Sequence, residues 1–153
     1  MAHFQRSITI EAPVHEVFEY WKDPRNWPEV WPSKIEASDV VQTPDGVGST
    51  DNWVYKMAGM RFKGTGEIVA CIPDRLIEYQ TSGDIDSTFV WAFEPDGEGD
   101  ELEENITRMR ADVTYTVPIP LLGKLLEAFV LKVNEHEAEV TLANLKARME
   151  HRG

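Results

Sequence analysis

Cysteine is nearly absent from this chain of 153 residues. Cys71 is the only one, so no internal disulfide can form and no metal site can be built from several thiolates. It lies in the apolar run IVACI, where we expect an inert buried thiol rather than a nucleophile. A single cysteine is also compatible with a reducing compartment.

Basic residues are scarce as well. The 15 lysines and arginines are outnumbered by 27 acidic residues, which gives a net charge of −12. Phosphate-rich partners need a basic surface, so nucleic acid is disfavoured as a partner, and anionic membranes would repel the chain on average. The acidic excess is spread along the chain apart from a cluster over 94–104, and it is typical of a solvated surface.

No hydrophobic run is long enough to span a membrane comfortably. The most apolar stretch, 117–133, is interrupted by two prolines and three charged residues, and each buried charge would be costly. The first residues, MAHFQRSITIEAP, reach an acidic residue before any apolar run of useful length. We therefore expect no secretory signal, no stable membrane insertion and a cytoplasmic location.

Several catalytic sequence motifs are missing too. His136 begins a sequence like the zinc-protease motif HExxH, but Val140 stands where the second histidine is needed. The segment 64–66, GTG, lacks the third glycine of a dinucleotide loop and lies in a strand pattern. No Walker or G-x-S-x-G sequence is present. We therefore expect no metal and no cofactor, and the sequence assigns no catalytic residue.

What the chain does have is a regular succession of short elements. Residues 3–10 alternate as a strand, and two short helices are predicted over 13–23 and 24–31, each ended by a proline-containing turn. Six further strands, separated by turns of Pro, Asp, Ser and Gly, are predicted over 34–42, 48–58, 61–72, 75–82, 86–95 and 103–117. Connections this short make successive strands antiparallel neighbours.

The longest predicted element is a helix over 121–148. One of its faces is apolar and the other is charged, and at 1.5 Å per residue it would be about 40 Å long. A helix of this length can cover the concave face of the whole sheet. The chain length suits one hydrophobic core, so we expect a single domain over 1–153.

Three segments of the sequence resemble the START-like (SRPBCC) superfamily, which includes polyketide cyclase/dehydrase-like and coenzyme Q-binding proteins. They are ITIEAPVHEVFEYWKDPRNWPEVWP, FVWAFEPDG and TYTVPIPLLGKLLEAF. The resemblance implies an α+β helix-grip fold: a seven-stranded curved antiparallel sheet wrapped around a long C-terminal helix, with two short helices between strands 1 and 2. It also implies a cavity between sheet and helix that takes apolar molecules. The segment GEGDELEEN departs from many relatives, but away from the expected cavity.

Strand phase predicts the walls of that cavity, because alternate residues of a strand face the same side. Aromatic side chains with polar tips are typical of a pocket wall, although plain core packing explains many inward aromatics equally well. Gly64 and Gly66 either permit sharp curvature or leave room for a ligand, and Trp27 and Trp31 fit either the rim or the core. The candidate ligand-binding residues are Trp53, Tyr55, Met57, Phe62, Tyr79, Phe89, Trp91, Phe93, Met109, Tyr115, Leu126, Phe129 and Val133.

The sequence leaves the function open between several classes. The first is binding, with transport or sequestration, of a small apolar or aromatic molecule such as a lipid, quinone or polyketide. The alternative is a polyketide cyclase or dehydratase-like enzyme, which needs polar groups converging in the cavity, such as Tyr55 with Tyr115 or Arg6. An adaptor for a protein partner would instead show a large exposed apolar patch. We expect a small apolar molecule as partner, and either a monomer or a homodimer.

Overall fold

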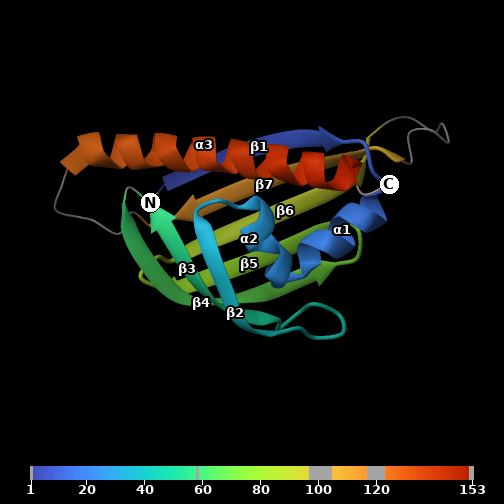
Figure 1. The fold of residues 1–153 in the computed structure, drawn as a ribbon, viewed down its shortest axis with the longest axis horizontal. Helices are drawn as coiled ribbons and strands as arrows, with labels where there is room; N and C mark the ends of the chain where they lie inside the picture. Colours follow the sequence, from blue (N-terminus) through green and yellow to red (C-terminus); the bar gives the residue numbers. More distant parts are fainter. Residues whose placement is uncertain (1, 58, 97–104, 117–122, 152–153) are drawn as a thin grey trace.

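The computed structural model describes residues 2–57, 59–96, 105–116 and 123–151, with only the backbone for 123–128. Within these ranges it has seven strands and a long C-terminal helix (Figure 1). The N-terminal elements are β1 (Ala2–Ile10), α1 (Val14–Lys22), the 3-10 turn η1 (Pro24–Asn26) and α2 (Trp27–Val30). The remaining elements are β2 (Lys34–Val41), β3 (Thr50–Met57), β4 (Met60–Ile72), β5 (Leu76–Gly83), β6 (Ser87–Pro95), β7 (Thr107–Tyr115) and α3 (Gly123–Glu150).

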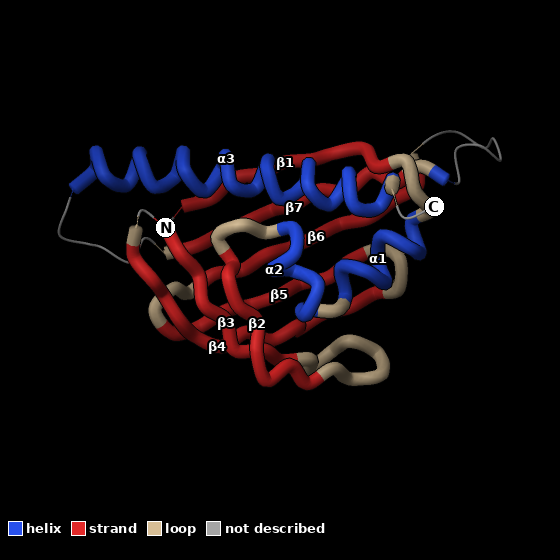
Figure 2. Tube along the Cα trace, in the orientation of Figure 1, coloured by secondary structure: helices blue, strands red, loops and turns tan. Residues whose placement is uncertain are grey.

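All seven strands belong to one antiparallel sheet with the order β1-β7-β6-β5-β4-β3-β2. Neighbours along the chain from β2 to β7 are neighbours in the sheet, and β1 pairs with β7 at the far edge. Figures 1 and 2 show α3 running along β1, with α1 and α2 lying over the same side of the curved sheet. The predicted helix-grip fold is confirmed, and the strand bounds differ from the prediction mainly at β3 and at the start of β7.

Tryptophan side chains pack the short helices against the sheet. Trp21 and Trp27 are fully buried, and the indole N–H of Trp27 donates a hydrogen bond of 2.8 Å to the Trp21 carbonyl. The Trp21 ring meets Trp91 of β6 edge-on, with 5.3 Å between the ring centroids. Aromatic rings bury large areas and pair favourably in this geometry, so the cluster fixes α1 and α2 against the sheet.

Polar contacts attach α3 to several parts of the chain, and two sets of them lie on opposite sides of the sheet. On β1, the Arg6 guanidinium forms ion pairs with Glu135 at 3.1 Å and Glu139 at 2.9 Å. Near α2, the side chain of Glu137 accepts a hydrogen bond of 2.6 Å from the backbone N–H of Ser33. Arg6 therefore holds the helix rather than pointing into a cavity, and α3 is tied to both sides of the curved sheet.

Neighbouring aromatic rings fill the space beside two glycines of β4. A Cβ atom on Gly66 would lie 2.0 Å from the hydroxyl of Tyr79, and one on Gly64 would lie 2.5 Å from the Trp53 ring. The sequence allowed these glycines to leave room for a ligand. In the structure that room is filled by Trp53 and Tyr79, so the glycines let the sheet accept large side chains on its concave face.

We expect Gly66→Ala to destabilise the protein by about 1–3 kcal/mol, because the new methyl group overlaps the buried Tyr79 ring. Equilibrium urea unfolding measures the change. Thr65→Ala, on the exposed side of the same strand, serves as the matched control and should stay within about 0.5 kcal/mol of wild type. Equal effects of the two substitutions would contradict this account of Gly66.

Candidate functional site

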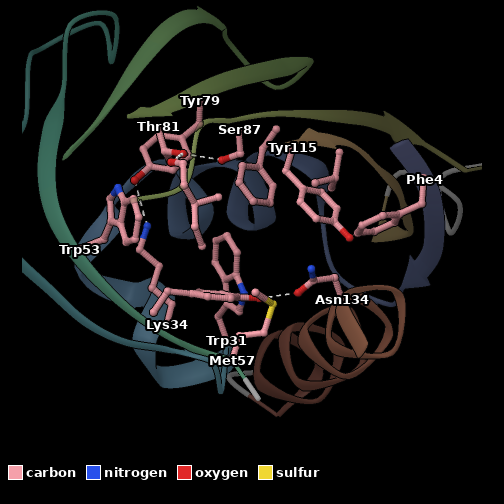
Figure 3. Close-up of a pocket in the computed structure, with 14 residues that line it drawn as sticks. Phe4, Trp31, Lys34, Trp53, Met57, Tyr79, Thr81, Ser87, Tyr115 and Asn134 are labelled. Carbon is pink, nitrogen blue, oxygen red and sulfur yellow. Dashed lines mark hydrogen bonds between the residues drawn. The ribbon is translucent and has the colours of Figure 1, made fainter. Parts of the chain in front are cut away.

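A pocket lies between the concave face of the sheet and α3 (Figure 3). Its volume is about 60 Å³. One water needs about 10–15 Å³, so the pocket has space for about five waters. It is walled by side chains of the sheet, of α3 and of the segment after α2. The lining residues are Phe4, Trp31, Lys34, Trp53, Tyr55, Met57, Tyr79, Thr81, Ile85, Ser87, Phe89, Val113, Tyr115 and Asn134.

Strand phase located much of this wall. Of the residues predicted from the sequence, six line the pocket: Trp53, Tyr55, Met57, Tyr79, Phe89 and Tyr115. Trp31, which fitted rim or core, also lines it, while Trp27 is completely buried in the core. Whether the six residues contact a ligand stays a prediction.

Other candidates lie elsewhere. Trp91, Phe93 and Met109 are buried in the core under α1 and α2, and Trp91 also borders a smaller hollow of about 30 Å³. Phe62 and Val133 pack in a second apolar cluster, beside the pocket but outside its lining. Those on strands follow the predicted strand faces, but packing accounts for the positions of all of them.

The prediction for α3 was wrong at Phe129. Phe129 was expected to face inward, but 55% of its surface is exposed. Val130 is buried instead, and Asn134 lines the pocket. At this turn of the helix the inward position is thus one residue later than predicted, while Val133 packs against the second apolar cluster. The side chain of Leu126 lies outside the described residues.

Tyr115 and Asn134 supply polar groups to one part of the pocket. The Tyr115 hydroxyl is buried and makes no well-formed hydrogen bond among the described residues, although the Asn134 side chain lies near enough to oppose part of the rise in its pKa. Asn134 reaches in from α3, and its side-chain oxygen accepts a hydrogen bond of 3.2 Å from Tyr55 (Figure 3). Burial raises the pKa of Tyr115 and of Tyr55, so both hydroxyls stay protonated at neutral pH. A molecule in the pocket would therefore meet a Tyr115 hydroxyl group that can still donate a hydrogen bond.

Lys34 and Asp51 form a buried ion pair that the sequence analysis missed. Lys34 is 3% exposed, and its Nζ lies 3.3 Å from Oδ2 of Asp51. The Tyr79 hydroxyl joins the two groups: it accepts a hydrogen bond of 2.9 Å from Lys34 and donates one of 2.6 Å to Asp51 Oδ1. Figure 3 places Lys34 beside Trp53, across the pocket from Tyr115. Lys34 and Tyr79 both line the pocket.

Rings surround the lysine amine. Its Nζ lies 4.4 Å from the ring centroid of Trp27, 5.1 Å from that of Trp31 and 4.6 Å from that of Tyr79. Burial lowers the pKa of Lys34 to about 8, and the carboxylate of Asp51 partly opposes that decrease. Burial also raises the pKa of Tyr79 well above its usual value. The ammonium is less favoured here than in water, despite its partner.

One of the missed residues was visible in the sequence pattern. Asp51 is in strand phase with Trp53, Tyr55 and Met57, which places it on the inner face. Nothing comparable marks Lys34, which follows a helical turn and opens β2. Its burial depends on the ring cluster and on Asp51, which only the folded chain brings together.

Neither a metal-binding group nor a membrane-spanning helix is found within the described ranges. There, no group of three or more His, Cys, Asp or Glu side chains is arranged to hold a metal ion. Among the same residues, no helix combines the length and the apolar composition that crossing a bilayer requires.

The sheet, the grip helix and the pocket between them define a START-like (SRPBCC) helix-grip protein. A family model agrees: residues 1–150 match the family described as "Polyketide cyclase / dehydrase and lipid transport". The chain belongs to that family, and membership supports a ligand-binding or cyclase role. No curated protein matches the chain.

Solved structures of low sequence identity share the fold. A START superfamily protein from Mycobacterium smegmatis matches with a TM-score of 0.79 and 16% identity, over 99% of both chains. The Thermus thermophilus protein TTHA0849 matches with a TM-score of 0.77 and 23% identity, over 97% of both. The Zhui aromatase/cyclase of a Streptomyces species matches with a TM-score of 0.73 and 17% identity, over 99% of this chain and 94% of that one. Identities this low show the fold alone.

We expect the Lys34–Asp51 pair to show strong coupling in a double-mutant cycle. Asp51→Asn leaves a buried lysine without its counter-ion and should cost about 3–5 kcal/mol, whereas adding Lys34→Met should recover a large part of that loss. Urea unfolding of the four proteins gives the coupling. The partly exposed pair of Lys22 and Glu19, tested as Lys22→Met and Glu19→Gln, should couple by about 0.5 kcal/mol or less. Additive losses at Lys34 and Asp51 would contradict a close buried pair.

The pH dependence of stability should also report on Lys34. Its folded pKa of about 8 lies below the ordinary value of 10.5, so between these values the unfolded chain binds more protons. The free energy of unfolding then rises with pH from about 8 to about 10, above which the raised pKa of Tyr79 opposes the gain. Wild type and the Lys34→Met/Asp51→Asn variant are compared by urea unfolding. Parallel pH curves for the two proteins would contradict the lowered pKa.

Proposed function

We propose that this protein binds a small apolar or aromatic molecule that carries an oxygen atom, in the pocket between the sheet and α3. The lipids, quinones and polyketides considered from the sequence contain such molecules. The observation that carries the proposal is the buried Tyr115 hydroxyl, which makes no well-formed hydrogen bond among the described residues and lines an otherwise largely apolar pocket.

The chemistry of the wall supports this ligand class. A buried polar group without a partner costs about 1–3 kcal/mol, and a ligand oxygen beside Tyr115 would recover part of that cost. Aromatic and aliphatic side chains around it, such as Phe4, Phe89 and Val113, favour an apolar body. Because the cavity measures only about 60 Å³, a ring can enter only if side chains at the pocket move outward, which favours small ligands.

A cyclase or dehydratase is the second candidate function. The observation that favours it is the group of Lys34, Asp51 and Tyr79, because proton donors and acceptors in a pocket wall are what such chemistry requires. Simple binding needs no such group. The two functions differ in turnover: an enzyme converts its ligand, whereas a binding or transport protein returns it unchanged.

The binding proposal predicts a preference for oxygen-bearing rings. We expect p-cresol to bind more tightly than toluene by about three- to tenfold, the usual value of one hydrogen bond. In Tyr115→Phe this preference should fall toward one, because the hydroxyl that meets the ligand oxygen is removed. Tyr20→Phe, a tyrosine outside the pocket lining, should leave the preference unchanged. Chemical-shift titration by NMR measures all these affinities.

Pocket-filling variants control for binding elsewhere. Val113→Phe places a ring in the cavity and should abolish binding of both probes, whereas Thr114→Phe, on the opposite face of β7, should not. Native mass spectrometry of freshly purified wild type, followed by extraction, then identifies any co-purified molecule. Binding of p-cresol that survives Val113→Phe would overturn the proposal.

A further inference from the structure

We propose that Lys34 forms an imine with the carbonyl carbon of a small aldehyde or ketone that enters the pocket. The proposal deepens the proposed function, on which it rests, by naming one class of oxygen-bearing ligand: molecules whose carbonyl group meets Lys34, across the pocket from Tyr115 (Figure 3). It is carried by the position of a buried amine in the wall of an apolar pocket, connected to a carboxylate through a tyrosine hydroxyl.

The surroundings of the amine make its neutral form more accessible than that of a surface lysine. Lys34 is buried among the rings of Trp27, Trp31 and Tyr79, within 5.1 Å of each centroid. Burial opposes the stabilisation of the ammonium by these rings and by Asp51, so a larger fraction of the amine carries a free lone pair than on a surface lysine, and this is how buried lysines become nucleophiles. The lowered pKa of Lys34, about 8, agrees with this effect of burial. Lys56 and Lys63, by contrast, are exposed.

The hydrogen bonds provide a path for the proton that must leave the ammonium. Lys34 donates to the Tyr79 hydroxyl at 2.9 Å, and that hydroxyl donates to Asp51 at 2.6 Å. Passing one proton along each bond gives a neutral amine, an unchanged tyrosine and a neutral carboxylic acid. The exchange replaces two buried charges by two neutral groups, which lowers the desolvation cost of the pair.

The proposed reaction balances without any further reactant. The amine lone pair forms a C–N bond to the carbonyl carbon, and the C=O π electrons move to the oxygen, which takes a proton. Loss of that oxygen as water, with a second proton, leaves the C=N bond. Of the three ammonium hydrogens, two leave in water and one is shared between the imine nitrogen and Asp51. Tyr79, hydrogen-bonded to both groups, conducts these transfers.

Reductive trapping tests the proposal. The full chain is incubated with benzaldehyde and sodium cyanoborohydride, which delivers hydride to the imine carbon and fixes a benzyl group on the nitrogen. Peptide mass spectrometry should place the benzyl group on Lys34 at least about tenfold faster than on Lys56. Lys34→Arg keeps the positive charge beside Asp51 and should abolish this modification, while Lys56→Arg should leave it unchanged. Urea unfolding verifies that each variant is folded.

A second variant tests the proton path. Tyr79→Phe keeps the amine and its ring but removes the hydroxyl between Lys34 and Asp51, so the trapping rate at Lys34 should fall about tenfold or more. Should Tyr79→Phe not fold, the Lys34→Arg comparison decides alone. Modification at surface lysines only, or at Lys34 no faster than at Lys56, would overturn the imine.

Benzyl alcohol separates this inference from the proposed function. It cannot form an imine, yet it carries the ring and an oxygen that the pocket is proposed to bind. Binding of benzyl alcohol that is lost in Val113→Phe, without trapping of benzaldehyde at Lys34, would overturn the imine and leave the binding function standing. Failure of both compounds to bind would overturn the proposed function itself.

Discussion

Tyr79 is the residue on which the architecture of the pocket depends. Its ring lies where a side chain on Gly66 would be, and it packs edge-on against Trp27 with 4.6 Å between the centroids. Its hydroxyl joins the amine of Lys34 to the carboxylate of Asp51. One side chain therefore connects β5 to β4, to the short helices, to β2 and to β3. The apolar packing of the ring and the hydrogen bonding of its tip require the same position, so each restrains the other.

Local patterns predicted the fold because each element carries its own signal. Alternation and turn residues marked the strands, and short connections dictated antiparallel neighbours. The family-like segments then supplied what local patterns lack, which is the joining of all seven strands in one sheet around the helix. The pairing of β1 with β7, across most of the chain, was not predicted. A small error occurred at the start of β3, which begins at Thr50 rather than at Gly48, because the turn that begins at Pro44 extends through Gly48.

The site was less predictable, because it depends on tertiary contacts. Strand phase has a period of two residues and leaves only two choices, so the faces of Trp53 and Tyr55 followed from the sequence. A helix face can rotate in smaller steps: one residue, about 100°, exchanges Phe129 for Val130 at the sheet. Hydropathy favoured the phenylalanine, whereas the ion pairs of Arg6 with Glu135 and Glu139 hold α3 in the observed orientation. The partners of those ion pairs are far apart along the chain, so no short segment of the sequence contains both.

The charges around the pocket bear on which molecules it can accept. The chain carries a net charge of −12, yet the buried group of Lys34, Asp51 and Tyr79 is neutral as a unit, because the ammonium balances the carboxylate. An anionic ligand would be repelled by the negatively charged protein. In the pocket the ammonium of Lys34 is already paired with Asp51, so it would offset little of the cost of desolvating the anion. A neutral oxygen-bearing molecule avoids both costs. It can accept a hydrogen bond from Tyr115. A carbonyl carbon can also approach the amine of Lys34 without adding a net charge to the buried group. The negative net charge and the paired cation thus agree with the proposed uncharged carbonyl and hydroxyl ligands.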